Sequence, residues 1–140
     1  MGGHNEHILV CVTGQRNCER LIRHSAQLAQ TLSIGKKCDI SVIHVAGGNN
    51  RFMGTQDEGA ALEYLFQISK AYNAAMTVMR NEDAAGTIAA FAKLRKVTRV
   101  VLGVPLISTG YDFAAELKGQ MSDVQFHVIP YDVGSEQSDG

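Results

Sequence analysis

An apolar run that stops abruptly at a glycine constrains the fold of this chain most. Residues 97–105 read VTRVVLGVP, and the apolar part of this segment leads directly into Gly103. Unbroken apolar runs of this length are typical of strands buried on both faces of a parallel sheet. A second such run, ILVCV at residues 8–12, is followed by Thr13 and Gly14. Because ligands of open α/β sheets bind at the carboxyl ends of the strands, the two strand ends predict a pocket.

The rest of the chain alternates between helical and strand patterns. Helical spacing of apolar residues predicts helices over about 17–35, 55–72, 84–95 and 111–121, and strand patterns cover 38–45, 75–79 and 124–130. This order predicts a single-domain α/β fold, a five-stranded parallel sheet with helices on both faces. The domain is expected over residues 1–133. Residues 134–140, rich in Ser, Gly and acids, are predicted to be a disordered tail.

Composition excludes several classes of partner. The formal net charge is −1 and the Lys and Arg residues are scattered, so no basic surface for nucleic acid is expected. No apolar stretch approaches the about 20 residues of a membrane-spanning helix, and residues 1–7 lack the apolar core of a signal peptide. We therefore expect a cytoplasmic protein with no membrane insertion. Reduced thiols, without a disulfide or metal site, are expected of Cys11, Cys18 and Cys38.

These segments resemble the universal stress protein family, and within it the domain found in KdpD-type potassium sensor kinases. The resemblance spans about residues 8–130 and rests on four fragments: ILVCV at 8–12, CERLIRHSA at 18–26, AAFA at 89–92 with VTRVVLG at 97–103, and FHVI at 126–129. It implies a stress or osmotic signalling module, linked to potassium sensing, that binds or senses a nucleotide-like ligand. It also implies a partner such as a sensor kinase, a channel or a transporter.

The resemblance leaves the identity of the ligand open. Nucleotide-binding members have an Asp at the end of the first strand, where this chain has Thr13, and a G-x2-G-x9-G-[ST] loop after the fourth. Of that loop only the first glycine, Gly103, is present, and Leu106 stands at the second. The segment from Gly103 to the last strand is also shortened. ATP or AMP would therefore meet an incomplete cradle of backbone N–H groups.

Some KdpD-type domains instead resemble receptors for cyclic di-AMP. Those receptors use residues of the first loop and the second strand. At the same positions of this chain, Thr13, Gln15 and Ser41 supply hydroxyl or amide donors, and the imidazole of His44 could stack on a purine. A phosphate could pair with Arg16. The predicted ligand-binding set is Thr13, Gly14, Gln15, Arg16, Ser41, His44, Val45, Gly103 and Val104. Because no nucleophile, base and oxyanion donor come together, we expect no catalytic residues and no enzyme activity.

The last strand predicts a homodimer. Its alternating apolar residues, Val124, Phe126 and Val128, would promote association if they lay at a free edge. The family resemblance implies that two copies pair this strand antiparallel across a two-fold axis. An alternative function is a dimerisation or docking module whose pocket is vestigial. The shortened segment after Gly103 favours that alternative.

Overall fold

The computed structural model describes residues 5–12, 18–34, 37–46, 58–103, 113–121 and 123–129. In this part of the chain five strands alternate with four helices. Their bounds are β1 (Glu6–Cys11), α1 (Cys18–Leu32), β2 (Cys38–Ala46), α2 (Glu58–Ala71), β3 (Ala75–Arg80), α3 (Ala84–Leu94), β4 (Arg99–Gly103), α4 (Phe113–Gln120) and β5 (Gln125–Ile129).

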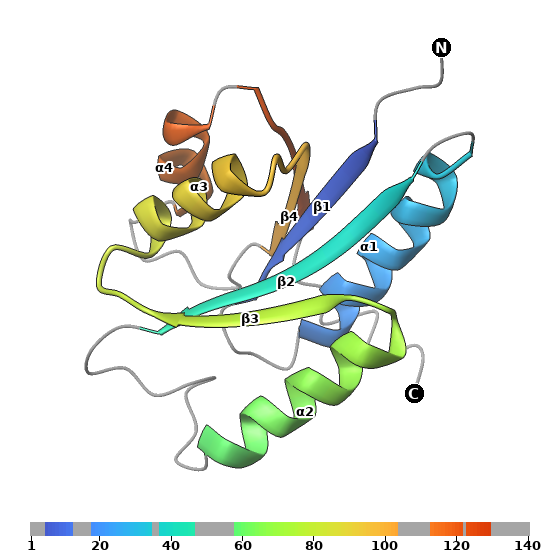
Figure 1. The fold of residues 1–140 in the computed structure, drawn as a ribbon. Coiled ribbons are helices and arrows are strands. Elements are labelled where there is room, and N and C mark those ends of the chain that lie inside the picture. The colour runs from blue at the N-terminus through green and yellow to red at the C-terminus, as the bar shows by residue number, and fades with distance from the viewer. Residues whose placement is uncertain are drawn as a thin grey trace.

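The strands form one sheet in the order β3-β2-β1-β4-β5, and every neighbouring pair is parallel. Helices α1 and α2 cover one face of the sheet, whereas α3 and α4 cover the other (Figure 1). The predicted α/β class, the parallel sheet and the helices on both faces are therefore confirmed. The chain moves outward from β1 through β2 to β3, then returns to the other side of β1 as β4.

Strand β1 divides the hydrophobic core into two layers. Ile8 and Val10 point into the cluster beneath α1 and α2, whereas Leu9 and Cys11 point into the cluster beneath α3 and α4. All four side chains are essentially inaccessible to solvent. This two-sided burial explains why the sequence of β1 is continuously apolar rather than alternating. Each buried aliphatic side chain of this size stabilises the fold by about 1.5–3 kcal/mol.

An acidic residue caps the start of α3. Asp83 is the N-cap, and its carboxylate accepts a hydrogen bond from the Gly86 N–H at 3.0 Å. A cap of this kind satisfies one of the backbone donors left unpaired in the first helical turn. A Cβ atom at Gly86 would collide with the Asp83 carboxylate, so this cap requires glycine at position 86.

Several predicted boundaries shift by a few residues. Helix α2 ends at Ala71, and Tyr72, predicted to be helical, lies in a turn in which Asn73 adopts a φ of 58°. Strand β4 begins at Arg99, so residues 97 and 98 precede it. Several predictions lie outside the described residues: the helix starts near 17 and 55, the helix end near 35, the shortened segment after β4 and the tail of residues 134–140.

Candidate functional site

The carboxyl ends of β1, β2 and β4 meet at one edge of the sheet, which we call the carboxyl edge. Cys11 of β1 pairs with Ile43 of β2 on one side and with Leu102 of β4 on the other. The residue after β1, Val12, continues the pairing, since its N–H donates to the Ile43 carbonyl at 3.1 Å. The chain adds strands on one side of β1 as far as β3, and then returns to add β4 on the other side of β1. Open α/β sheets bind their ligands at such a switch point.

The His44 side chain forms a hydrogen bond that connects the end of β2 to the end of β1. This side chain is only 6% exposed, and its Nδ1 lies 2.9 Å from the carbonyl oxygen of Val12. Because a carbonyl can only accept, Nδ1 carries the proton and donates it. His44 therefore lies at the carboxyl edge, as predicted, on the face covered by α1 and α2. Val45 lies beside it and packs against the cluster on the opposite face.

Ser41 does not share that position. It precedes His44 by three residues, which is about 10 Å along an extended strand, and an odd spacing places the two side chains on opposite faces. The Ser41 hydroxyl instead lies 2.7 Å from His7 Nε2, and the side chain is buried. The structure thus brings His44, Val45 and Gly103 to the carboxyl edge and separates Ser41 from them. The other predicted ligand residues lie outside the described residues: Thr13, Gly14, Gln15, Arg16 and Val104.

The opposite edge of the sheet, the amino edge, carries a hydrogen-bond network that the sequence analysis missed. The Thr98 hydroxyl accepts from the His7 N–H at 3.0 Å and donates to Glu6 Oε1 at 2.6 Å. The same carboxylate oxygen lies 3.2 Å from Arg99 Nε, in an ion pair whose two side chains are less than one-fifth exposed. These contacts join the first residues of β1 to the segment that enters β4.

His7 extends this network to α3. Its Nδ1 donates to the carbonyl oxygen of Arg95, the C-cap residue of α3, at 3.1 Å. Its other ring nitrogen, Nε2, consequently accepts from the Ser41 hydroxyl when the ring is neutral. The two ring nitrogens of His7 therefore join β1 to β2 through Ser41 and to the end of α3 through Arg95.

Strand β5 is an edge of the described sheet, and its side chains pack against the rest of the domain. The three residues of the predicted dimer interface, Val124, Phe126 and Val128, are half-buried against the cluster beneath α3 and α4. The Lys118 ammonium lies 5.9 Å from the centroid of the Phe126 ring. These residues therefore already stabilise the monomer, and their role between two copies stays a prediction.

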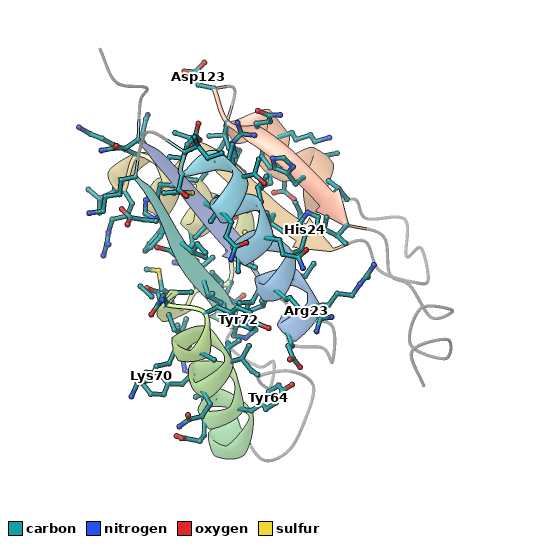
Figure 2. The ribbon with its side chains drawn as sticks, turned by 90° about the vertical axis from the view of Figure 1, so that its right-hand side faces the viewer. Arg23, His24, Tyr64, Lys70, Tyr72 and Asp123 are labelled. Carbon is teal, nitrogen blue, oxygen red and sulfur yellow. The ribbon has the colours of Figure 1, made fainter. Side chains whose placement is uncertain are left out.

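A charged group on the other face of β5 includes His127. Arg99 Nη1 donates to His127 Nε2 at 3.2 Å, which requires the ring to be unprotonated at that nitrogen. His24 projects from α1 on the same side (Figure 2). Burial, the Arg99 guanidinium and His24 together hold the pKa of His127 below its ordinary value. The ring is accordingly kept neutral near pH 7.

The thiol of Cys11 is buried beneath the carboxyl edge. Burial raises the pKa of the Cys11 thiol to about 12, so a thiolate nucleophile does not form at this position near neutral pH. Among the described residues no group of three or more His, Cys, Asp or Glu side chains could hold a metal ion. No helix in the same ranges is long and apolar enough to cross a membrane.

Comparison with solved structures decides the fold. A universal stress protein in complex with cAMP superimposes with a TM-score of 0.67 at 13% identity, over 89% of this chain and 96% of that one. The universal stress protein from Archaeoglobus fulgidus gives 0.64 at 18% identity, over 91% and 93% of the two chains. This chain has the universal stress protein fold.

A third structure, the Archaeoglobus fulgidus protein in complex with dAMP, matches with a TM-score of 0.62 at 16% identity, over 91% of this chain and 98% of that one. At the level of sequence, no protein-family model and no curated protein matches this chain. The predicted resemblance is thus confirmed for the universal stress protein fold. The finer likeness to potassium sensor kinases has no support in these comparisons.

Proposed function

We propose that this chain is a cytoplasmic signalling module that binds an adenine nucleotide at the carboxyl edge, between β1 and β4. The observation that carries the proposal is the reversal of strand order between these two strands, with Gly103 ending β4 beside the end of β1. The solved structures of this fold in complex with cAMP and dAMP support it. The proposed role is ligand binding rather than catalysis.

The sequence of the site favours a ligand with few phosphates. Thr13 stands where nucleotide-binding members of the family have an Asp, and Leu106 stands at the second glycine of their loop. A row of glycines lets backbone N–H groups approach a phosphate chain closely, and this chain keeps only the first of them. AMP, a cyclic mononucleotide or cyclic di-AMP therefore fits the proposal better than ATP does.

We test nucleotide binding by titrating the purified chain with AMP, cAMP, cyclic di-AMP and ATP and following the melting temperature. A ligand that binds only the folded state must raise it. Gly103→Val adds a side chain at the proposed site and should lower the affinity by at least about ten-fold. The matched control is Gly119→Val, because a Cβ atom at Gly119 meets nothing within 4 Å.

Circular dichroism must show that both glycine variants fold. Should Gly103→Val fail to fold, Gly103→Ala adds a single methyl group and serves the same comparison. An unchanged melting temperature with all four nucleotides at millimolar concentration would overturn the proposal. Equal losses in Gly103→Val and Gly119→Val would place the site elsewhere.

Signal output is proposed to run through a homodimer paired along β5 and a partner such as a sensor kinase, a channel or a transporter. The likeness of residues 18–26 to the start of a helix in potassium sensor kinases supports a potassium or osmotic context. Phe126→Lys should shift the mass measured by sedimentation toward the 15.1 kDa of one chain. The control is Phe66→Lys, at an exposed position of α2. A wild-type chain that sediments as a monomer at every concentration would exclude the dimer.

A dimerisation or docking module with a vestigial pocket is the second candidate. The replacements at Thr13 and Leu106 favour it, because they remove the features that give family members their affinity for phosphate. This candidate predicts no nucleotide-dependent change in melting temperature together with an intact dimer. The nucleotide titration and the sedimentation experiment therefore separate the two functions.

A further inference from the structure

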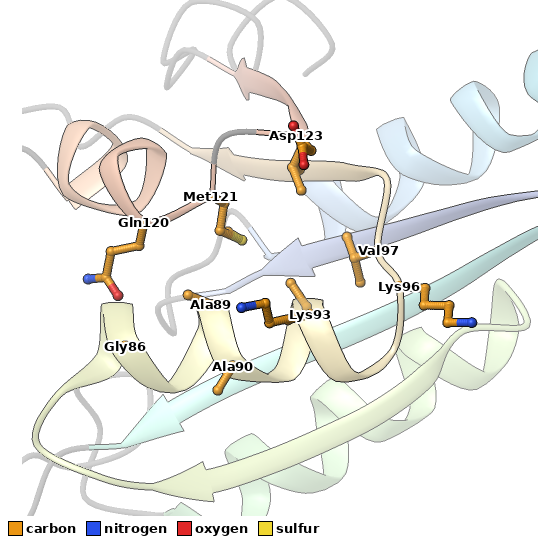
Figure 3. A pocket seen from close by; sticks show the side chains of 11 residues that line it. Gly86, Ala89, Ala90, Lys93, Lys96, Val97, Gln120, Met121 and Asp123 are labelled. Carbon is orange, nitrogen blue, oxygen red and sulfur yellow. The ribbon is translucent and has the colours of Figure 1, made fainter.

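A cavity of about 620 Å³ lies between α3 and the segment that joins α4 to β5 (Figure 3). Val97 and Val124 line it, and they lead into β4 and β5, so the cavity opens near the amino ends of these strands. It is therefore separate from the carboxyl edge at which nucleotide binding is proposed. Its volume lies within the about 300–1,000 Å³ of typical small-molecule pockets.

The inner part of the cavity is apolar. Ala92, Val97 and Met121 belong to the core beneath α3 and α4 and are each less than one-tenth exposed. One wall is made by Ala89 and Ala90 on successive positions of α3. These methyl side chains leave the space open that larger residues would fill. A ligand could accordingly bury an aromatic or alkyl body here and gain about 25 cal/mol for each Å² of apolar surface removed from water.

The rim of the cavity is polar and carries more positive than negative charge. Lys93 lies one helical turn from Ala89, and its ammonium is directed toward that residue in Figure 3. Lys96 continues the same rim beyond the end of α3, while Gln120 and Asp123 belong to the facing wall. Within the described ranges neither lysine forms an ion pair with an acid. The charge on Lys93 is therefore available to a ligand.

Lys96 ends α3 in a Schellman motif: its N–H donates to the Lys93 carbonyl at 3.3 Å, and the Val97 N–H donates to the Ala92 carbonyl at 2.9 Å. The Lys96 φ of 57° lies in the left-handed region, which Gly and Asn tolerate best, and Asn73 is the other described residue with a positive φ that is not glycine. For a lysine this backbone conformation costs about 1–2 kcal/mol. A glycine would end α3 with less strain but would bring no charge to the rim of the cavity.

We propose that this cavity binds a small amphipathic monoanion, with its apolar body on Val97 and Met121 and its anionic group on Lys93. The carboxylate of Asp123 on the facing wall disfavours ligands with several negative charges. Carboxylates, sulfonates and phosphate monoesters attached to an apolar ring or chain have the required chemistry. The proposal stands on this cavity alone and holds whether or not a nucleotide binds at the carboxyl edge.

The first probe is 8-anilinonaphthalene-1-sulfonate, an aromatic monoanion whose fluorescence rises when its ring system leaves water. The folded full-length chain should bind one equivalent saturably. Lys93→Gln should weaken binding by about ten-fold, the value of one lost charge-assisted contact. Ala89→Leu should abolish binding by filling the cavity. The control Lys70→Gln, at an exposed lysine of α2, should leave the affinity unchanged.

An uncharged analogue and a competition experiment complete the test. N-phenyl-1-naphthylamine lacks the sulfonate, so it should bind Lys93→Gln as well as the wild type and should fail to bind Ala89→Leu. Wild-type affinity of the sulfonate for both variants would overturn the proposal, as would displacement of the sulfonate by saturating AMP. Circular dichroism and the melting temperature verify that each variant is folded.

Discussion

The two edges of the sheet are built differently, although the same strands form both. At the carboxyl edge the strands end in small or apolar residues, Val12, Val45 and Gly103, with His44 as the buried polar side chain. At the amino edge the strands begin with charged and polar residues that bond to one another across three strands and to the end of α3. In the described residues the carboxyl edge therefore carries few polar side chains, whereas the amino edge carries several that bond to one another.

We infer that the amino edge contributes mainly to stability and the carboxyl edge mainly to ligand binding. Buried hydrogen bonds to charged groups contribute about 1.5–3 kcal/mol each, and removing one partner leaves the other unsatisfied. At the amino edge the partly buried bond from Thr98 to the Glu6 carboxylate is of the charge-assisted kind, and two further bonds, His7–Thr98 and His7–Arg95, help to align β1, β4 and α3. These contacts lie at the opposite ends of the strands from Gly103 and the proposed nucleotide site. Variants at the two edges should therefore separate stability from binding.

Thr98→Val should produce the largest change in stability. Valine keeps the shape of threonine but removes the acceptor of the His7 N–H and the donor to Glu6. We expect the free energy of unfolding to fall by about 2 kcal/mol in urea denaturation, with no change in nucleotide affinity. The control is Thr77→Val, a half-buried threonine of β3 whose hydroxyl makes no hydrogen bond to a described residue.

Two results would contradict this comparison of the edges. Equal effects of Thr98→Val and Thr77→Val on the free energy of unfolding would show that the network adds nothing. A loss of nucleotide affinity in folded Thr98→Val would show that the amino edge takes part in ligand binding.

Acidification should destabilise the fold through His127, whose ring contacts Arg99. Burial, Arg99 and His24 lower the pKa of this ring in the folded state, so the unfolded chain takes up a proton at a higher pH than the folded chain. The contribution of His127 to the free energy of unfolding should hence level off above about pH 7 and decrease as the pH falls below about 6.5 toward the lowered pKa. His127→Gln should make this decrease shallower. An identical pH dependence in wild type and His127→Gln would refute the assignment.

The smallest expected effect concerns reactivity rather than stability. Cys11 ends β1 just beneath the carboxyl edge, and its buried thiol has a pKa of about 12. N-ethylmaleimide at pH 8 should label Cys38, which is half-buried, well before Cys11. Peptide mass spectrometry at timed intervals follows both sites. Equal labelling rates in the folded chain would mean that the end of β1 around Cys11 readily becomes exposed to solvent.

Most of the fold could be predicted because its signals are local. The continuous apolar residues of β1 and β4, the acidic start of α3 and the alternation of strand and helix patterns all depend on neighbours in the sequence. The end of α2 was misplaced by one residue because Tyr72 fits the apolar spacing, while the turn depends on Asn73.

The candidate site was predicted less well because it depends on faces and distant contacts. Ser41 and His44 looked like neighbouring donors on one strand, yet their odd spacing alone places them on opposite faces. The amino-edge network joins residues more than 90 positions apart, such as Glu6 and Thr98. No local sequence pattern predicts such a contact. A usable signal was the presence of a polar pair at the start of each central strand, Glu6–His7 and Thr98–Arg99, which parallel pairing brings together.

The central claim is that the carboxyl edge binds an adenine nucleotide while the amino edge does not. Amide chemical shifts of the ¹⁵N-labelled chain, recorded during titration with AMP, examine both edges in one experiment. The account predicts progressive, saturable shifts at Val12, His44 and Gly103, and unchanged signals at His7, Ser41 and Thr98. Unchanged signals at the carboxyl edge at millimolar AMP, or the largest shifts at the amino edge, would contradict it.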